Sequence, residues 1–156
     1  MSGASLDLRP ATAGDSRLLF AWANDPLTRK MARNPKPIAW GDHEVWLGRK
    51  LASADCRIWI AEAGGAPVDQ VRLDRRGDGA EIDYSVAADR RGEGWGTAIL
   101  NALTAGHAPG VAMAFGEARA ENEASARAFL AAGFVEEKGN DIPEGYRRFA
   151  KELTDG

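Results

Sequence analysis

The chain has 156 residues, a length typical of one domain, and we expect residues 1–156 to fold as a single domain. Its 20 basic and 23 acidic residues leave a net charge of −3, which argues against nucleic acid or an anionic membrane as a partner. A single cysteine excludes an internal disulfide framework. Because the whole sequence has only this cysteine and two histidines, it predicts no metal site.

The first part of the chain predicts a strand followed by two helices. Leu6 and Leu8 alternate with polar residues, which is typical of a strand. Thr12-x-x-Asp15 has the form of a capping box and opens a helical pattern, which Asn24-Asp25-Pro26 is expected to end. The predicted order is a strand over residues 5–9, a helix from Thr12 to Ala23, an irregular segment over residues 27–38 and a second helix from Gly41.

From Cys56 onward the apolar residues follow the two-residue period of strands, interrupted by two helical segments. Gly64-Gly65 is typical of a hairpin turn, and Gly133 stands where helices commonly end. The predicted strands cover residues 58–61, 68–74, 80–87, 111–118, 134–138 and 146–152, and the predicted helices cover residues 95–107 and 122–132. The order β-αα-βββ-α-β-α-ββ indicates an α/β fold, a mixed sheet with helices on its faces.

The most informative segment is a glycine-rich stretch between a predicted strand and a predicted helix, residues 89–97 (DRRGEGWGT). Three glycines in five residues let the backbone N–H groups point one way, and the helix N-terminus adds partial positive charge. With Arg90 and Arg91 nearby, this predicts a site for a pyrophosphate, although a plain glycine-rich turn has the same pattern. No Gly-Lys-Ser/Thr follows as in a Walker loop, and the position after an antiparallel meander is not that of a dinucleotide-binding fingerprint.

These residues also carry a family resemblance. Arg91-x-x-Gly94-x-Gly96 resembles the Gln/Arg-x-x-Gly-x-Gly/Ala signature of the GNAT acetyltransferase superfamily, and residues 82–86 (IDYSV) look like its fourth strand. Asn122-x-x-Ser125 followed by residues 132–134 (AGF) is similar to the family's Asn-x-x-Ala/Ser…Leu-Gly-Phe segment. The resemblance covers nearly the whole chain. It implies a mostly antiparallel sheet that splays between its fourth and fifth strands, and an N-acetyltransferase that uses acetyl-CoA.

The resemblance further implies how the coenzyme is held. The loop amides bind the pyrophosphate, a backbone amide near Val86 stabilises the oxyanion, and Asn122 contacts the pantetheine arm, although Asn122 would also suit a helix N-cap. Many relatives have a proton-donating tyrosine where this chain has Phe129. Either the thiolate, a good leaving group, departs without a proton donor, or another hydroxyl serves, for which the candidates are Ser125, Tyr84 and Tyr146. The expected coenzyme contacts are Val86, Arg91, Gly92, Gly94, Trp95, Gly96, Thr97, Asn122, Ser125 and Phe129.

Acetyl transfer by direct attack needs a base that takes a proton from the amine, and it needs no covalent enzyme intermediate. The candidates are carboxylates on the strands beside the coenzyme. Glu117 lies near the end of the predicted fifth strand, and Glu81 and Asp83 share one face of the fourth. We expect Glu117 to be the base, with Glu81 or Asp83 as the substitute. Each of the three is also compatible with a solvated strand position.

Looser similarities in the first half of the chain indicate the acceptor. Trp22-x-Asn24-Asp25-Pro26 and residues 70–74 (QVRLD) look like the GNATs that acetylate nucleotide-linked amino-sugars, as in pseudaminic-acid-type biosynthesis. This implies a UDP-linked amino-sugar, whose diphosphate would lie on the cations between Arg29 and Lys36, although such a run is usually a solvated face. The expected acceptor contacts are Asn24, Arg29, Arg33, His43 and Trp46. His43 is also compatible with a position on a helix surface, and Trp46 with a position in the core.

Two other functions fit the sequence. One is acetylation of protein N-termini, of the ribosomal-protein type, which an open acidic groove would favour. The other is an acyl-CoA-binding module without catalysis, which Phe129 favours. The expected partner is a small-molecule amine, and the expected state is a monomer or homodimer. The chain has no run of about 18 apolar residues and no signal-peptide pattern, so we expect a cytoplasmic protein without a membrane partner.

Overall fold

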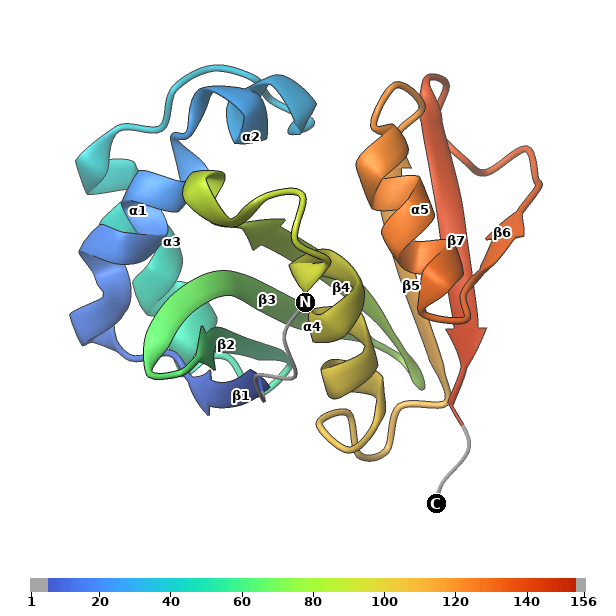
Figure 1. The fold of residues 1–156 in the computed structure, drawn as a ribbon, viewed down its shortest axis with the longest axis horizontal. Helices are drawn as coiled ribbons and strands as arrows, with labels where there is room; N and C mark the ends of the chain where they lie inside the picture. The colour runs from blue at the N-terminus through green and yellow to red at the C-terminus, as the bar shows by residue number, and fades with distance from the viewer. Residues whose placement is uncertain (1–5, 154–156) are drawn as a thin grey trace.

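The computed structural model describes residues 6–153, so Ser5, the first residue of the predicted first strand, lies outside the described residues. Within this range one mixed sheet of seven strands has the order β1-β2-β3-β4-β5-β7-β6 (Figure 1). The strands are β1 (Leu6–Pro10), β2 (Cys56–Ala63), β3 (Ala66–Arg76), β4 (Gly79–Val86), β5 (Met113–Arg119), β6 (Val135–Glu137) and β7 (Tyr146–Glu152). The helices are α1 (Ser16–Ala23), α2 (Pro26–Met31), α3 (Trp40–Ala52), α4 (Trp95–Thr104) and α5 (Glu123–Ala131), with short 3-10 turns at Ala13–Asp15 and Ala88–Arg90.

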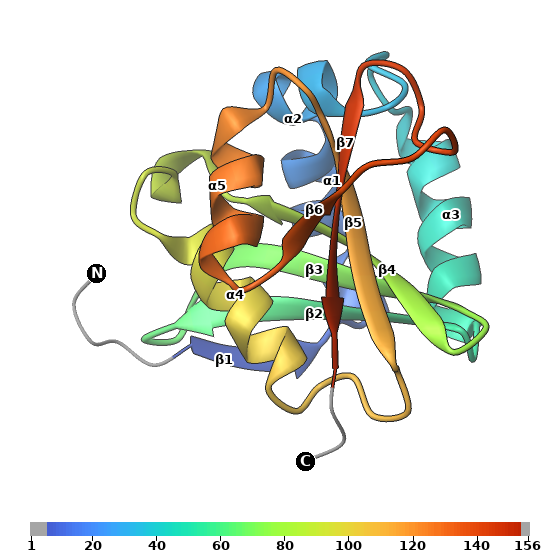
Figure 2. The ribbon, with the colours of Figure 1, turned by 90° about the vertical axis from the view of Figure 1, so that its right-hand side faces the viewer.

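Helices cover both faces of the sheet, which confirms the predicted mixed α/β architecture (Figures 1 and 2). Strand β2, which lies between β1 and β3, shows why helices are needed on both faces of the sheet, because it is apolar on both faces. Trp59 and Ala61 pack into the larger core beneath α4 and α5, and Ile58 and Ile60 pack into a second core with residues of α1 and α3. A strand buried on both faces has this near-continuous apolar sequence.

The segment between α1 and α3 differs from the expected irregular structure over residues 27–38, because Pro26–Met31 form α2. The Asp25 carboxylate accepts a hydrogen bond from the Thr28 N–H (3.1 Å), and Pro26 occupies the first turn, where its missing N–H has no helical acceptor to lose. The Asn-Asp-Pro sequence that ends α1 therefore also begins α2.

The sheet splits along its middle. β4 and β5 are parallel and pair only at Gly79↔Met113, Ala80↔Ala114 and Glu81↔Phe115. Beyond these pairs the two strands diverge, and a V-shaped separation between them is visible in Figure 1. The predicted splay between the fourth and fifth strands is confirmed, and the carboxyl ends of both strands border the opening.

Within residues 6–153, no helix is long and apolar enough to cross a membrane.

Candidate active site

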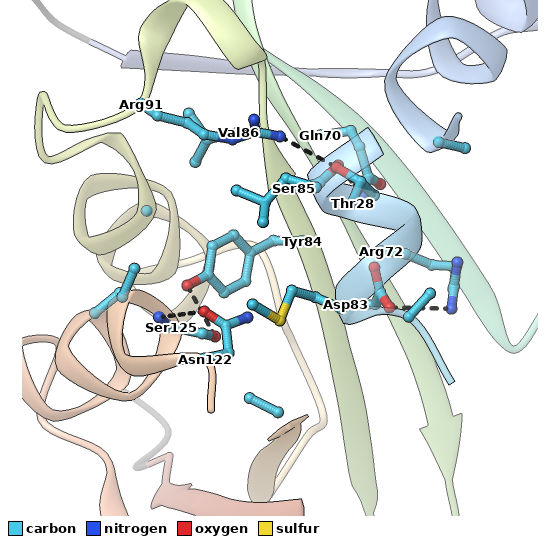
Figure 3. Close-up of a pocket in the computed structure, with 18 of the residues that line it drawn as sticks. Thr28, Gln70, Arg72, Asp83, Tyr84, Ser85, Val86, Arg91, Asn122 and Ser125 are labelled. Atoms are coloured by element: carbon cyan, nitrogen blue, oxygen red, sulfur yellow. Dashed lines mark hydrogen bonds and ion pairs between the residues drawn. The ribbon is translucent and has the colours of Figure 1, made fainter. Parts of the chain in front are cut away.

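A cavity of about 940 Å³ occupies the region where β4 and β5 diverge. Residues of β3, β4, α2 and α3 line one side of it, and residues of the loop before α4, of α4 itself and of α5 line the other (Figure 3). All ten residues predicted to contact a coenzyme lie on its wall, although they come from three separate parts of the chain.

The loop between β4 and α4 forms one end of the cavity. Gly92 and Gly94 have φ angles of 79° and 86°, a conformation that residues with side chains rarely adopt. α4 then begins at Trp95, and the N–H groups of its first turn have no acceptor within the helix. With Arg90 and Arg91 on the same wall, this end carries the partial and full positive charges that suit a diphosphate.

Close packing fixes the loop to the strands beneath it. The indole of Trp95 is buried, and its Nε1–H donates a hydrogen bond to Glu93 Oε1 (2.8 Å). A β-carbon at Gly96 would lie 3.2 Å from Cε2 of Tyr84, so glycine allows the first turn of α4 to approach β4. Thr97 follows on the cavity wall. The glycines thus serve both the conformation of the loop and its packing.

The opposite wall begins at the N-terminus of α5. Asn122 Oδ1 accepts a hydrogen bond from the Ser125 N–H (3.2 Å), which is the N-cap role that the sequence left open for Asn122. The hydroxyl oxygens of Ser125 and Tyr84 lie 3.2 Å apart and link α5 to β4 (Figure 3). Burial raises the pKa of the Tyr84 hydroxyl to about 12, so that hydroxyl keeps its proton at neutral pH.

Phe129 belongs to an aromatic cluster of the core and also reaches the cavity wall. Its ring is 2% exposed, stacks on Phe149 with 5.3 Å between ring centroids, and meets Tyr84 edge-on at 5.8 Å. Phe129 has no group that can protonate a thiolate, but it holds the Tyr84 ring in place.

Glu117 lies on the cavity wall at the side of β5, with its side chain 6% exposed. Its Oε1 accepts a hydrogen bond from Arg33 Nη2 (2.7 Å), and its Oε2 accepts hydrogen bonds from Nη2 and Nε of Arg148 (2.6 and 2.8 Å). Both carboxylate oxygens of the first candidate base are therefore already engaged by guanidinium groups.

The two carboxylates of β4 have different environments. Glu81 accepts hydrogen bonds from Arg33 (3.1 Å) and Arg76 (3.0 Å) and is not part of the cavity wall. Asp83 is on the wall, with its side chain 56% exposed, and Arg72 Nη2 lies 3.8 Å from its Oδ2 (Figure 3). Among the three predicted carboxylates, Asp83 is the one that lines the cavity without a hydrogen bond to a described residue.

Two of the predicted acceptor residues bind backbone groups of their own segment. The Asn24 amide donates to the Ile38 carbonyl (2.9 Å) and accepts from the Ile38 N–H (2.8 Å), and Asn24 does not line the cavity. Arg29 lines it, but its guanidinium donates to the carbonyls of Ala23 (2.6 Å) and Asn34 (2.9 Å). Both side chains fix the path of the chain around α2.

The other three predicted acceptor residues are spread around the opening. His43 is buried, with its Nε2 3.0 Å from the Ser16 carbonyl oxygen, and it touches the cavity wall. Trp46 is partly exposed on the wall, with the Arg72 guanidinium 5.2 Å from its ring centroid. Arg33 is bound to the two glutamates and does not line the cavity.

Several residues on the wall were not predicted as site residues. Gln70, Arg72 and Ser85 face the cavity from β3 and β4, and the Gln70 amide donates to the Ser85 hydroxyl (3.1 Å) (Figure 3). A period-two run of polar residues in a strand whose other face is apolar is the signal that could have identified Gln70 and Arg72. The hydrogen bonds from Arg91 to Asp25 (2.6 Å) and to Thr28 (3.2 Å) join residues more than 60 positions apart and have no such signal.

Within residues 6–153, no three histidine, cysteine, aspartate or glutamate side chains are grouped so that they could hold a metal ion.

Comparison with solved structures shows that the fold occurs in several acetyltransferases. The aminoglycoside acetyltransferase AAC(6')-Ib, in complex with paromomycin and acetyl-CoA, superposes with a TM-score of 0.81 at 22% identity, covering 95% of this chain and 93% of that one. A spermidine N-acetyltransferase from Vibrio cholerae, in complex with CoA and spermine, has a TM-score of 0.82 at 17% identity, covering 95% of both chains. RimL, a ribosomal L7/L12 alpha-N-protein acetyltransferase in complex with CoA, has a TM-score of 0.81 at 14% identity, covering 97% and 96%.

A search of curated proteins gave no match to the chain. A family model does match, the acetyltransferase (GNAT) domain, and its match runs over residues 5–135. Those residues include the first strand, the glycine-rich loop, the divergent pair of strands and α5. The match agrees with the fold and with the resemblance carried by Arg91-x-x-Gly94-x-Gly96. The chain therefore belongs to the GNAT acetyltransferase domain family.

Proposed function

We propose that this acetyltransferase transfers the acetyl group of acetyl-CoA to the primary amine of a small amino-sugar. The single observation that carries the proposal is the arrangement at the split sheet, in which a glycine-rich loop and a helix N-terminus form one end of a cavity between β4 and β5. The loop suits a pyrophosphate, and the edges of β4 and β5 that face each other without pairing suit an extended arm with amide groups. These are the two parts of coenzyme A that precede the thiol.

In the proposed reaction both substrates are bound together. The lone pair of the acceptor nitrogen attacks the thioester carbonyl carbon, a C–N bond forms, and the C–S bond then breaks. One proton leaves the nitrogen, and one proton reaches the departing sulfur. The chain must therefore supply a proton acceptor and a proton donor near the middle of the cavity.

We assign the proton acceptor to Asp83, in place of the Glu117 that the sequence favours. Asp83 lines the cavity and has an exposed carboxylate, which can take the proton directly or through one water. The Glu117 oxygens are occupied by Arg33 and Arg148, which supports a role in holding the two sides of the opening together.

We assign the proton donor to the pair of hydroxyls of Tyr84 and Ser125. The pair lies on the cavity wall, and the raised pKa of the Tyr84 hydroxyl keeps that group protonated at neutral pH. A donor on β4 would compensate for the missing hydroxyl at Phe129. This argues against a binding module without catalysis.

The acceptor side of the cavity supports a hydroxylated molecule. Gln70, Ser85 and Thr28 offer hydrogen bonds there, and Trp46 offers part of an aromatic surface. The nucleotide of the expected UDP-linked sugar has weaker support. Of the described cations from Arg29 to Lys36, Arg29 is the one that lines the cavity, and its donors bind backbone carbonyls.

The direct test is release of free thiol from acetyl-CoA with a panel of amines. The panel contains an amino-sugar with and without a linked nucleotide, an aminoglycoside, spermidine and a peptide with a free N-terminus. We expect the amino-sugars to give the highest kcat/KM. A preference for the peptide would instead favour acetylation of protein N-termini, and no turnover with any amine together with tight coenzyme binding would favour a binding module.

A matched pair of glycine variants tests the coenzyme site by calorimetry. Gly94→Ala adds a methyl group to a residue of the cavity wall, and Gly65→Ala makes the same change at a similar φ of 82° in the β2–β3 turn. Both carry the backbone strain of a side chain at positive φ, so both should lower stability. Only Gly94→Ala should weaken acetyl-CoA binding, and equal affinity in the two variants would contradict the proposed site.

A further inference from the structure

The short helix α2 lies over the cavity. Both of its ends are bound to elements that border the separation between β4 and β5. Leu27, Thr28 and Met31 of α2 form part of the cavity wall on the acceptor side. Whatever fixes α2 in place therefore also fixes the shape of the space into which an acceptor binds.

At its beginning, α2 is bound to the glycine-rich loop. Arg91 Nη2 donates hydrogen bonds to Asp25 Oδ2 (2.6 Å) and to Thr28 Oγ1 (3.2 Å), and Figure 3 shows the Arg91 side chain reaching from the loop to Thr28. The same Asp25 oxygen accepts the Thr28 N–H (3.1 Å) and so caps the helix. One carboxylate thus holds the first turn of α2 and the loop arginine together.

At its end, α2 is bound to β5. Arg119 Nη2 donates to the carbonyl of Ala32, the residue after α2, at 2.7 Å, and Arg33 Nη2 donates to Glu117 Oε1, also at 2.7 Å. The helix and the two residues after it therefore run from the coenzyme loop on one side of the split sheet to β5 on the other.

Arg91 has the capacity to bind Asp25 and a phosphate at the same time. Within residues 6–153 its Nε and Nη1 groups make no hydrogen bond, and the side chain is partly exposed on the cavity wall. A guanidinium has five N–H donors in a fixed plane, so it can hold a carboxylate along one edge and a phosphate along another. Burial would raise the pKa of Asp25, but the hydrogen bonds from Arg91 and Thr28 outweigh it and lower that pKa, so Asp25 stays charged at neutral pH.

We propose that Asp25 is a positioning residue that couples coenzyme binding to the acceptor site. When a coenzyme phosphate binds beside Arg91, the guanidinium loses its freedom to turn, and through Asp25 it holds α2 in the position seen in the structure. The acceptor wall is then held more firmly in the coenzyme complex than in the free protein. The inference rests on the proposed function, since it requires the pyrophosphate to bind at the glycine-rich loop.

Hydrogen–deuterium exchange with and without coenzyme A tests the coupling in the whole chain. In the wild-type protein, coenzyme A should slow exchange both at the loop, residues 88–97, and at residues 25–38. Asp25→Ser keeps an N-cap for α2, because serine also caps helices, but its side chain is too short to reach Arg91. In this variant we expect the slowing at residues 88–97 to remain and the slowing at residues 25–38 to be lost.

Two further variants make the test specific. Glu44→Gln removes one carboxylate charge from the exposed face of α3 and should behave as wild type. Asp25→Asn keeps an oxygen acceptor without the charge, so it should lose part of the slowing at residues 25–38, and it serves as the test variant if Asp25→Ser does not fold.

The outcomes separate this inference from the proposed function. Slowing at residues 25–38 that persists in Asp25→Ser would overturn the coupling, and so would wild-type slowing confined to residues 88–97. Wild-type protein with no slowing at residues 88–97 would overturn the proposed coenzyme site, and the coupling with it.

Discussion

The hydroxyl oxygens of Tyr84 and Ser125 lie 3.2 Å apart and join β4 to α5 at the point where the sheet has separated. The two residues belong to opposite sides of the gap. Their contact therefore places two hydroxyl groups beside the apolar ring of Phe129, against which Tyr84 packs. A thiolate that departs along the gap would find its proton there.

Tyr84→Phe should lower kcat while leaving acetyl-CoA affinity unchanged. The ring and its packing on Phe129 are kept, and only the hydroxyl is lost, so we expect a decrease of about 10²-fold, the lower end for the loss of an acid catalyst. Tyr146→Phe removes the other predicted tyrosine hydroxyl, whose residue is not on the cavity wall. Steady-state kinetics of both variants decide between them, and loss of kcat only in Tyr146→Phe would contradict the assignment.

Asp83→Asn should abolish most turnover, by about 10²–10⁴-fold, because the proton acceptor is replaced by a group that cannot take a proton. Coenzyme affinity and thermal stability should change little, since the carboxylate is exposed and makes no hydrogen bond to a described residue.

Glu117→Gln is expected to act on stability instead. The change removes the charge of a mostly buried acceptor that Arg33 and Arg148 share, while Arg33 keeps Glu81 and Arg148 keeps Asp141. It should cost about 1.5–3 kcal/mol, measured by denaturant unfolding. A larger loss of kcat in Glu117→Gln than in Asp83→Asn would return the role of base to Glu117.

Asp69 should make stability depend on pH. Its carboxyl is fully buried and has no hydrogen-bond partner among the described residues, and burial raises its pKa to about 9. The folded state therefore keeps a proton that the unfolded state loses near pH 4, so this group makes the free energy of unfolding fall as pH rises between these values, by at most about 1.4 kcal/mol per pH unit.

Asp69→Asn removes that titration. Compared with wild type, the variant should gain stability at pH 8 relative to pH 5, as measured by urea unfolding at both values. Asp7→Asn, at an exposed position of β1, provides the control and should keep the wild-type difference. If Asp69→Asn keeps the same difference as well, Asp69 is ionised in the folded state.

Two glycines should respond in opposite ways to alanine. A β-carbon at Gly116 would lie 2.9 Å from Cε1 of Phe129 and closer still to its Cζ, so Gly116→Ala should destabilise by about 1–3 kcal/mol through overpacking. Gly48 is in the middle of α3 with nothing within 4 Å of such a carbon, and Gly48→Ala should stabilise by about 1 kcal/mol. Thermal unfolding of both variants measures the contrast, and a neutral Gly116→Ala would mean that Phe129 moves away at little cost.

The elements of the fold could be predicted because their signals are local. Periodicity places most strands to within two residues, and the glycines before Trp95 indicate both the turn and the helix start. The helix α2 was not predicted, because Asn24-Asp25-Pro26 has the composition of a break, and the same residues form an N-cap with proline in the first turn.

The roles within the site depend on contacts that sequence spacing does not contain. Glu117 is engaged by Arg33 and Arg148, which lie 84 and 31 positions away. The donors of Arg29 are used by carbonyls of its own segment, so a run of cations in the sequence does not become a cationic wall. Side-chain pairing of this kind follows from the tertiary fold, and it decides which carboxylate on the cavity wall has no hydrogen-bond donor bound to it.

The three residue pairs that join β4 to β5 also have a consequence for folding. They form a narrow seam of backbone pairing between one half of the sheet, β1 to β4, and the other, β5 to β7. The halves are therefore joined mainly by the side chains of the shared core, and loosening of that packing would let them open from each other. A ligand lying in the gap would contact both halves and would favour the closed state by mass action. The opening of the two halves at this seam would then be the local unfolding step that ligand concentration suppresses most strongly.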